Sequence, residues 1–295
     1  MKKIKKRKSG KLKNRSKLSN VIDDTQDELV EAIGQFTVPC PICGEDYHRV
    51  GQHAQAKHGI IIPDFKATYH YTTATGAAAY KLLRLYGGRT DRYIEQTISH
   101  KTGKPIYVTY DAATQPHLDP WDRYIGVRKV ISHLRGTRTY GVTFHDYRAK
   151  FFGFDIDFYF TSPGNQALTV VLLVHTLESL NIPRDCIHIL RSGMKGFHID
   201  LYFDDWMPIK ALLKLGQRAV ELTGLTNASP YVKVEFRPEG IKGGRGVRLP
   251  LGMHQETGIV MDYLDFGPLT VEPYPNQYEY LLYSTNTKTT PCDPI

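Results

Sequence analysis

The stretch that decides the fold is Lys150-Phe-Phe-Gly-Phe-Asp-Ile-Asp-Phe-Tyr-Phe160. Its aromatic residues predict a strand in the interior of a sheet. Side chains alternate between the faces of a strand, so Asp155 and Asp157 share one face while their apolar neighbours pack on the other. Two carboxylates ~7 Å apart on one face repel each other unless a cation lies between them, which predicts a Mg²⁺ or Mn²⁺ site. A surface strand of alternating polarity is the alternative, but buried aspartates without a metal would be costly.

A second motif is Arg191-Ser-Gly-Met-Lys-Gly-Phe-His198. Its two glycines allow a tight loop whose backbone N–H groups can face an anion. Ser192 adds a hydroxyl, Lys195 adds a mobile charge, and His198 begins the next strand. The motif predicts a cradle for a triphosphate, whereas the simpler interpretation is a glycine hairpin beside a core histidine.

A later strand, Val232-Lys-Val-Glu-Phe236, supplies a candidate third carboxylate. The alternation of this strand allows Glu235 to share the face of the two aspartates. Asp200 and Asp204 are the competing candidates. After a glycine-rich loop, Arg248 could reach a phosphate or a template strand, or serve as a structural ion-pair partner.

The pattern around these motifs alternates between strands and helices. It predicts an α+β fold with a mostly antiparallel or mixed sheet. A weak helical pattern over residues 76–104 indicates a connector. The other expected elements are strands at 105–110, 139–144, 186–191, 196–203 and 247–249, and helices at 164–180 and 208–222.

Near the N-terminus, the pair Cys40 and Cys43 is followed by His53 and His58. Two thiolates on a turn and two imidazoles on a following helix can close a tetrahedral zinc site. A segment this short would take much of its stability from the metal. His48 is a spare imidazole that could replace His53. The alternative of a free cysteine pair with scattered histidines is disfavoured by the glycine that directly follows the second cysteine.

The net charge of +8 is concentrated at the N-terminus, because residues 1–20 hold ten of the 38 Lys and Arg and no Asp or Glu. The remaining chain has 28 basic and 30 acidic residues. Such a tail predicts a disordered arm with salt-sensitive affinity for nucleic acid, or simply a solubilising extension. Four cysteines and the lack of a signal or membrane-spanning pattern predict a cytoplasmic protein with no membrane partner.

Residues 40–69 resemble the bacterial Ros/MucR zinc-finger family. The resemblance lies in the Cys and His spacing, the His58-Gly-Ile ending, and the stretch Pro63-Asp-Phe-Lys-Ala-Thr-Tyr69. It implies contact with DNA. Only two lysines occur there, which favours docking or substrate gripping over base-specific reading.

Residues 107–265 resemble the archaeo-eukaryotic primase superfamily. The resemblance lies in the order Asp-x-Asp, then Ser-Gly-x-Lys-Gly-x-His, then an acidic residue on a later strand, although the family usually has Asp at that last position. The Arg248-Leu-Pro segment with His254 is similar to primase-like polymerases of bacterial mobile elements. The resemblance implies a core related to the RNA-recognition fold with two divalent ions. It assigns the ions to Asp155, Asp157 and Glu235, and the phosphates of the incoming nucleotide to Ser192, Lys195 and His198.

These features predict a template-dependent DNA primase or primase-polymerase that uses two Mg²⁺ or Mn²⁺ ions and a structural Zn²⁺. Its expected partners are single-stranded DNA, NTP or dNTP, and a replicative helicase or replication initiator of a plasmid, phage or integrative element. Two alternatives remain: a DNA-binding initiator or regulator with a non-synthesising core, and an Asp-x-Asp nucleotide-sugar transferase. The predicted organisation is a basic tail 1–20, a zinc-finger module 21–75, a helical connector 76–106, a catalytic domain 107–275 and a C-terminal tail 276–295.

Overall fold

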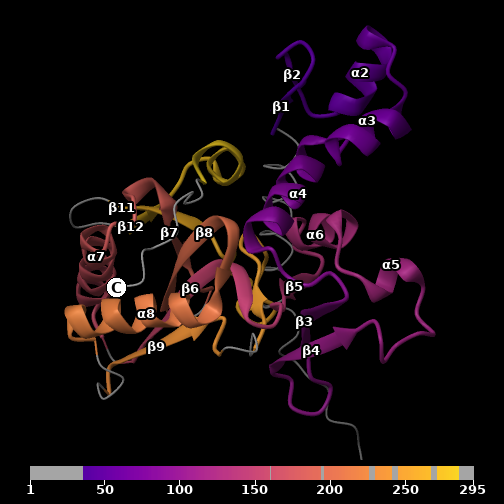
Figure 1. The fold of residues 1–295 in the computed structure, drawn as a ribbon. Helices are drawn as coiled ribbons and strands as arrows, with labels where there is room; N and C mark the ends of the chain where they lie inside the picture. The colour runs from indigo at the N-terminus through magenta and orange to yellow at the C-terminus, as the bar shows by residue number, and fades with distance from the viewer. Residues whose placement is uncertain are drawn as a thin grey trace, which may run out of the picture.

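The computed structural model describes residues 36–159, 161–193, 196–225, 230–240, 245–266 and 271–285. These residues form an N-terminal module, a connecting helix and two antiparallel sheets (Figure 1). Some sequence-based predictions fall outside the described residues: the basic tail 1–20, the first part of the module (21–35), Lys195 and residues 286–295.

The N-terminal module is a two-stranded hairpin followed by two short helices. These are β1 (Val38–Pro39), β2 (Asp46–Tyr47), α2 (Val50–His58) and α3 (Ile62–Tyr69). The turn between the strands passes through Gly44, whose φ of 79° favours glycine. Its N–H donates to the Cys40 carbonyl at 2.8 Å, which closes the turn. In Figure 1 the module stands apart from the two sheets, beyond one end of α4.

Helix α4 (Ala74–Tyr86) joins the module to the sheets. It begins at Thr73, whose hydroxyl accepts a hydrogen bond from the Gly76 N–H at 3.0 Å. It ends at Gly87, where a φ of 50° stops the helix. Small buried side chains at residues 77–79 let the helix pack closely against its neighbours.

The helix predicted across residues 76–106 is wrong beyond Tyr86, because residues 92–98 form the strand β3 (Arg92–Ile98). Four consecutive residues of this strand, 93–96, are buried. A strand covered on both faces lacks the alternation that marks a half-exposed strand, so the sequence pattern was ambiguous. The preceding Gly88 fits tightly against the sheet, since a Cβ there would lie 2.4 Å from the Val142 side chain.

The smaller sheet has four strands in the order β10-β5-β3-β4. Its other strands are β4 (Pro105–Asp111), β5 (Thr139–Val142) and β10 (Val247–Arg248). Two helices, α5 (Pro120–Arg123) and α6 (Val127–Leu134), connect β4 to β5, and α6 packs against α4.

The larger sheet has six strands in the order β12-β11-β7-β8-β6-β9. They are β6 (Arg148–Phe158), β7 (Ile187–Arg191), β8 (Gly196–Pro208), β9 (Val232–Arg237), β11 (Tyr263–Phe266) and β12 (Val271–Pro273). Helices α7 (Pro163–Ser179) and α8 (Ile209–Thr223) lie together beside this sheet (Figure 1), and α8 packs on Phe152 through Gly216. Tyr86 of α4 stacks on Phe151, which points to the other face of β6, at 4.5 Å between ring centroids.

The chain between and after these strands adds three short helical segments. They are η1 (Arg184–Cys186), α9 (Gln277–Glu279) and the π-helix η2 (Tyr280–Ser284). Lys81 of α4 donates to the carbonyls of Leu282 and Thr285, at 3.5 and 3.2 Å, which ties η2 to α4.

The predicted fold class, α+β with antiparallel sheets, is confirmed, and every pairing among the described strands is antiparallel. The predicted helices at 164–180 and 208–222 are present as α7 and α8. No helix of the described ranges is both long enough and apolar enough to cross a bilayer.

A buried histidine holds β10 and the segment after it in place. The Tyr140 backbone N–H donates to His133 Nδ1 at 2.9 Å, so Nε2 carries the proton and donates to the Pro250 carbonyl at 2.9 Å. Gly252 packs directly on this ring, because a Cβ at Gly252 would lie 1.9 Å from His133 Cε1. No larger residue fits there without displacing the histidine.

We therefore predict that Gly252→Ala lowers the free energy of unfolding by about 1–3 kcal/mol, the usual cost of overpacking. Denaturant melts of the purified variant would measure this loss. The matched control is Gly164→Ala in the first turn of α7, where a Cβ meets nothing within 4 Å. The control should keep or slightly raise stability. Equal stability of Gly252→Ala and wild type would contradict the packing described here.

Candidate active site and metal sites

The register of three central strands brings the predicted site residues together. Asp155 of β6 lies directly across from His198 of β8 on one side and from Glu235 of β9 on the other. Asp157 occupies the next row of the same face, opposite Lys233. Opposed residues of antiparallel strands share a face, so these side chains all project to one side of the sheet.

Ion pairs join this row. Asp155 Oδ1 lies 3.3 Å from His198 Nε2, and Asp155 Oδ2 lies 3.0 Å from Arg237 Nη2. The same Arg237 nitrogen lies 2.8 Å from Glu235 Oε2, and Lys233 pairs with the other Glu235 oxygen. The Arg237 guanidinium therefore bridges the two carboxylates. The sequence motifs do not include Arg237, although its place two residues after Glu235 puts it on the same face of β9.

These contacts keep both carboxylates ionised. Burial opposes the charge of Asp155, but His198 and Arg237 outweigh it and lower the pKa to about 2. Burial likewise acts to lower the pKa of His198, and Asp155 reverses this effect and raises it. Hydrogen bonds from Lys233 and Arg237 lower the pKa of Glu235. Ionised carboxylate oxygens are the ligands that Mg²⁺ and Mn²⁺ prefer, so this donor set fits a divalent ion without loss of a proton.

The row of carboxylates opens into a cleft of about 750 Å³ between the two sheets. The six-stranded sheet provides one wall, with Asp155, Asp157 and His198 among its residues. The four-stranded sheet provides the opposite wall, which includes Tyr107 of β4 and Arg248 of β10. The site is thus built from both sheets, whose strands alternate along the sequence.

Arg248 is buried in the wall of this cleft. Its Nη2 donates to the Ser192 carbonyl, whereas its Nη1 is buried and has no hydrogen-bond partner among the described residues. A buried donor without a partner is costly, so this N–H is a candidate donor to a ligand bound in the cleft. This position agrees with the predicted contact between Arg248 and a phosphate.

The loop that carries Ser192 is a tight turn. The Ser192 N–H donates to the Gly196 carbonyl at 3.0 Å, and the Gly196 N–H donates to the Ser192 hydroxyl at 3.1 Å. Gly193 has a φ of 79°, and a Cβ there would lie 3.0 Å from Arg248 Nη2. Both the backbone angle and the lack of space favour glycine. The structure thus brings Ser192, His198 and Arg248 together at one end of the cleft, while Lys195 lies outside the described residues.

His254 lines the cleft beside this turn. Burial and the neighbouring charge of Arg248 lower its pKa to about 4, so the ring is neutral at physiological pH. Its Nδ1 accepts long hydrogen bonds from the N–H groups of Glu256 and Thr257, at 3.3 and 3.4 Å. His198 differs, because Asp155 raises its pKa.

The two competitors of Glu235 lie elsewhere. Asp200 is fully buried, and its Oδ2 accepts hydrogen bonds from the hydroxyls of Tyr86 and Tyr202, at 2.5 and 3.4 Å. Asp204 is exposed and lines a separate cavity beside α4. Of the three candidates, Glu235 is the one that faces Asp155, and it stays our prediction for the third carboxylate.

Burial raises the pKa of Asp200 to about 6. The folded protein therefore keeps this proton up to about pH 6, whereas the unfolded chain releases it near pH 4. Between these values the folded state binds more protons, so Asp200 makes stability fall as the pH rises from about 4 to about 6.

We predict that Asp200→Asn removes this decrease in the free energy of unfolding with rising pH. The decrease amounts to as much as about 3 kcal/mol between pH 4 and pH 7. Unfolding free energies of wild type and variant at both pH values would measure it. Asp204→Asn, at an exposed position, should keep the wild-type pH dependence. An unchanged pH dependence in Asp200→Asn would contradict the prediction.

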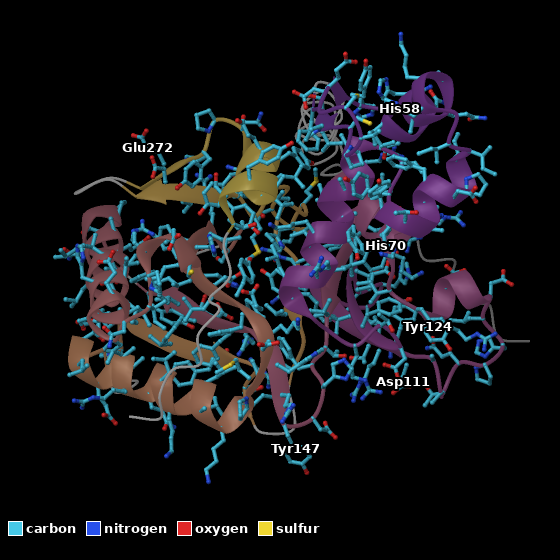
Figure 2. All side chains as sticks on the ribbon, turned by 45° about the horizontal axis from the view of Figure 1, so that its top comes forward. His58, His70, Asp111, Tyr124, Tyr147 and Glu272 are labelled. Carbon is cyan, nitrogen blue, oxygen red and sulfur yellow. The ribbon has the colours of Figure 1, made fainter. Side chains whose placement is uncertain are left out.

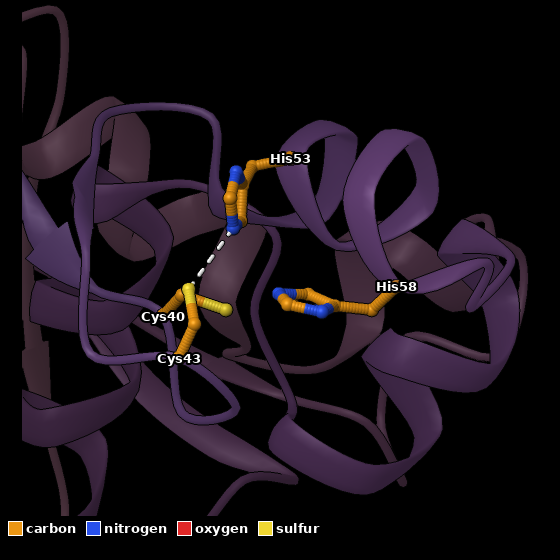
Figure 3. A group of neighbouring side chains, drawn as sticks. All are labelled: Cys40, Cys43, His53 and His58. Atoms are coloured by element: carbon orange, nitrogen blue, oxygen red, sulfur yellow. Dashed lines mark hydrogen bonds between the residues drawn. The ribbon is translucent and has the colours of Figure 1, made fainter.

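The Cys and His residues of the N-terminal module form a second candidate metal site (Figure 3). The possible ligand atoms of Cys40, Cys43, His53 and His58 all lie within 4.8 Å of one another. Cys43 Sγ is 3.3 Å from His53 Nε2, and His58 Nε2 is buried without a hydrogen-bond partner among the described residues. Two thiols and two imidazoles in this arrangement fit a tetrahedral Zn²⁺.

The choice between the histidines is also resolved. His48 does not replace His53, because its Nδ1 hydrogen-bonds with the Phe36 carbonyl at 2.9 Å. His53 instead faces the cysteines, and the Tyr47 ring stacks on it at 3.7 Å between centroids. The predicted set of four ligands is therefore together in the structure, while Zn²⁺ binding and the Ros/MucR resemblance stay predictions.

We predict that the purified protein holds about one zinc ion per chain. Cys43→Ser should lose this zinc and lower the melting temperature, because metal binding contributes to the folding of so small a module. Elemental analysis and a thermal melt would measure both effects. The control Cys186→Ser, at the last residue of η1, should keep its zinc. A wild-type protein free of zinc after purification in zinc-containing buffer would contradict the prediction.

Comparisons with known proteins bear mainly on the fold. No family model matches the chain, and no curated protein sequence matches it. One matching solved structure is the polymerase domain of Mycobacterium tuberculosis Ligase D in complex with DNA, with a TM-score of 0.48 and 13% identity over 71% of this chain and 84% of that chain. Another is the AEP domain of the cyanophage S-2L primase-polymerase, with a TM-score of 0.32 and 16% identity over 67% of this chain and 90% of that chain.

Proposed function

We propose that the chain is a template-dependent DNA primase or primase-polymerase that makes primers by nucleotidyl transfer. The observation that supports this most is the placement of Asp155, Asp157 and His198 in a cleft whose opposite wall includes Arg248, whose Nη1 has no hydrogen-bond partner among the described residues. Glu235 lies directly across from Asp155 on the neighbouring strand. The two solved structures named above are of the same class. Their TM-scores are below 0.5, so the proposal depends on the site and on the sequence motifs.

Asp155, Asp157 and Glu235 would hold two divalent ions. When bound, such ions lower the pKa of the attacking 3′-hydroxyl and neutralise the leaving pyrophosphate. The chain itself needs no nucleophilic side chain in this reaction. Its contribution is to place the reacting groups in line and to stabilise the charge that develops between them.

The cationic side of the cleft would orient the triphosphate. His198 is favoured as an imidazolium by Asp155, and Arg248 offers a buried N–H donor. Ser192 and the predicted contact of Lys195 add donors at the same turn. These groups are charged or preorganised before the substrate arrives, which limits the reorganisation needed during transfer.

Arg237 has a distinct part in this proposal. It occupies oxygens of Asp155 and Glu235, the atoms that would ligate an ion. Metal binding at those oxygens would release the guanidinium toward the phosphates. Planar guanidinium groups bind phosphate through paired hydrogen bonds, so both arrangements suit the same side chain.

The N-terminal module and the basic tail would hold the template. A zinc-stabilised module at the far end of α4 and a chain segment rich in Lys and Arg are suited to sequence-independent contact with single-stranded DNA. In this proposal the protein would act in the replication of a plasmid, phage or integrative element, with a helicase or an initiator as its partner.

A primer-synthesis assay on single-stranded DNA, with NTP or dNTP and either Mg²⁺ or Mn²⁺, tests the function. The double variant Asp155→Asn/Asp157→Asn should lose synthesis by at least about 100-fold, because the ions lose their ligands. The control Asp204→Asn removes an exposed carboxylate of the same sheet and should keep activity.

The outcomes separate the classes of protein. Synthesis that survives the double variant would refute the site assignment. Wild-type binding of DNA without any synthesis would favour the replication initiator or regulator. Transfer from a labelled nucleotide sugar, with no primer made, would favour the sugar transferase.

A further inference from the structure

Tyr107 lines the cleft from the four-stranded sheet, and the sequence motifs did not single it out. It lies on β4 directly across from Gln96 of β3, on the face of the four-stranded sheet that also carries Arg248. Its side chain is half exposed, at 51%, and it has no ring contact among the described residues. Tyr110 of the same strand, by contrast, stacks on Tyr93 at 5.0 Å. Tyr107 is therefore free to contact a ligand.

A hydrogen-bonded relay fixes the phenol oxygen of Tyr107. The Gln255 backbone N–H donates to Gln96 Oε1 at 2.9 Å, which orients the Gln96 amide. Gln96 Nε2 then donates to the Tyr107 hydroxyl oxygen at 3.1 Å. Since an amide NH₂ group only donates, the Tyr107 oxygen accepts this bond and its own hydrogen is left to point elsewhere.

The relay is rigid because its middle member is buried. Gln96 is only 3% exposed, and the side chain of Gln255 is held in turn by the Thr139 hydroxyl at 2.7 Å. A phenol remains protonated at neutral pH. Tyr107 thus presents a neutral O–H donor whose oxygen is held in position by Gln96.

The charges that act on the Tyr107 hydroxyl identify the ligand class. They come from Arg248, Asp155 and Arg237, which line the same cleft. The Arg248 Nη1 group also lacks a partner. Two residues that can donate hydrogen bonds, one neutral and one cationic, therefore line the same cleft as Asp155 and Asp157. An anionic oxygen fills such a space better than a ribose hydroxyl or a base edge, because it accepts from both donors.

We propose that Tyr107 donates a hydrogen bond to a phosphate oxygen of the bound nucleoside triphosphate, opposite His198 and beside Arg248. Gln96 acts as a positioning residue that sets the direction of this bond. The inference rests on the proposed function, since it requires a nucleotide in the cleft. It adds a second contact from the four-stranded sheet, beside that of Arg248, to the phosphate site.

The test measures binding of ATP and of adenosine to the full chain in Mn²⁺ without DNA, so that no transfer occurs. Tyr107→Phe keeps the ring and removes the hydroxyl. It should weaken ATP binding by about tenfold, the size of one hydrogen bond to a charged group, and leave adenosine binding unchanged. The control Tyr147→Phe removes an exposed hydroxyl at the surface labelled in Figure 2 and should change neither.

Gln96→Met tests the relay, because methionine has similar length but cannot donate. It should weaken ATP binding by a smaller factor than Tyr107→Phe does. An unchanged melting temperature of the Gln96→Met variant would confirm that it is folded. Unchanged ATP affinity in Tyr107→Phe would overturn the proposal. Equal weakening of ATP and adenosine would also overturn it, since the contact would then be to the sugar or base. A wild-type protein that does not bind ATP would overturn the proposed function as well.

Discussion

Carboxylates that share one face of a buried strand repel one another, and the surrounding strands must supply the compensating cations. In this chain the antiparallel register does so: Asp155 lies between His198 on one neighbour and Glu235 on the other, with Arg237 across both carboxylates. A shift of one residue in either pairing would turn these side chains to the face covered by α7 and α8, where Phe152 and Phe154 pack. Register, charge compensation and core packing therefore depend on one another.

Helix α4 connects this site to the N-terminal module. At its beginning, the Ala74 N–H donates to the His48 carbonyl at 2.8 Å, within the module that holds the Cys and His cluster. At its end, the Tyr86 hydroxyl donates to Asp200, two residues along β8 from His198. Through Tyr202 the same network reaches Tyr263 of β11, with 3.2 Å between the hydroxyl oxygens. One helix thus anchors the module and supports the strand that carries the site histidine.

The sequence allowed the larger sheet and much of its site to be predicted, because the Asp-x-Asp strand alternates clearly and the serine–histidine turn has glycines where the backbone requires them. The smaller sheet was harder to foresee. Its strand β3 buries four consecutive residues, Tyr93 through Gln96, so buried and exposed positions do not alternate. The sequence pattern of this strand therefore resembled part of a helical connector. Tyr107 and Arg237 were missed for a related reason: each depends on a partner strand, and pairing between strands cannot be read from one strand alone.

The charges of the cleft suit a ligand that brings its own cations. Without one, Arg237 and Lys233 compensate Glu235, and His198 compensates Asp155. A triphosphate that arrives with two divalent ions has a net charge near zero, so its binding changes the net charge of the cleft little. The ions could take the carboxylates while Arg237, His198 and Arg248 turn to the phosphates. Each charged group would exchange one partner for another, and none would be left buried and unpaired, which is the condition for tight binding in a site of low dielectric. A nucleotide without metal would leave the carboxylates facing phosphate oxygens. The arrangement of charges in the cleft therefore explains why the proposed reaction requires both the nucleotide and the divalent ions.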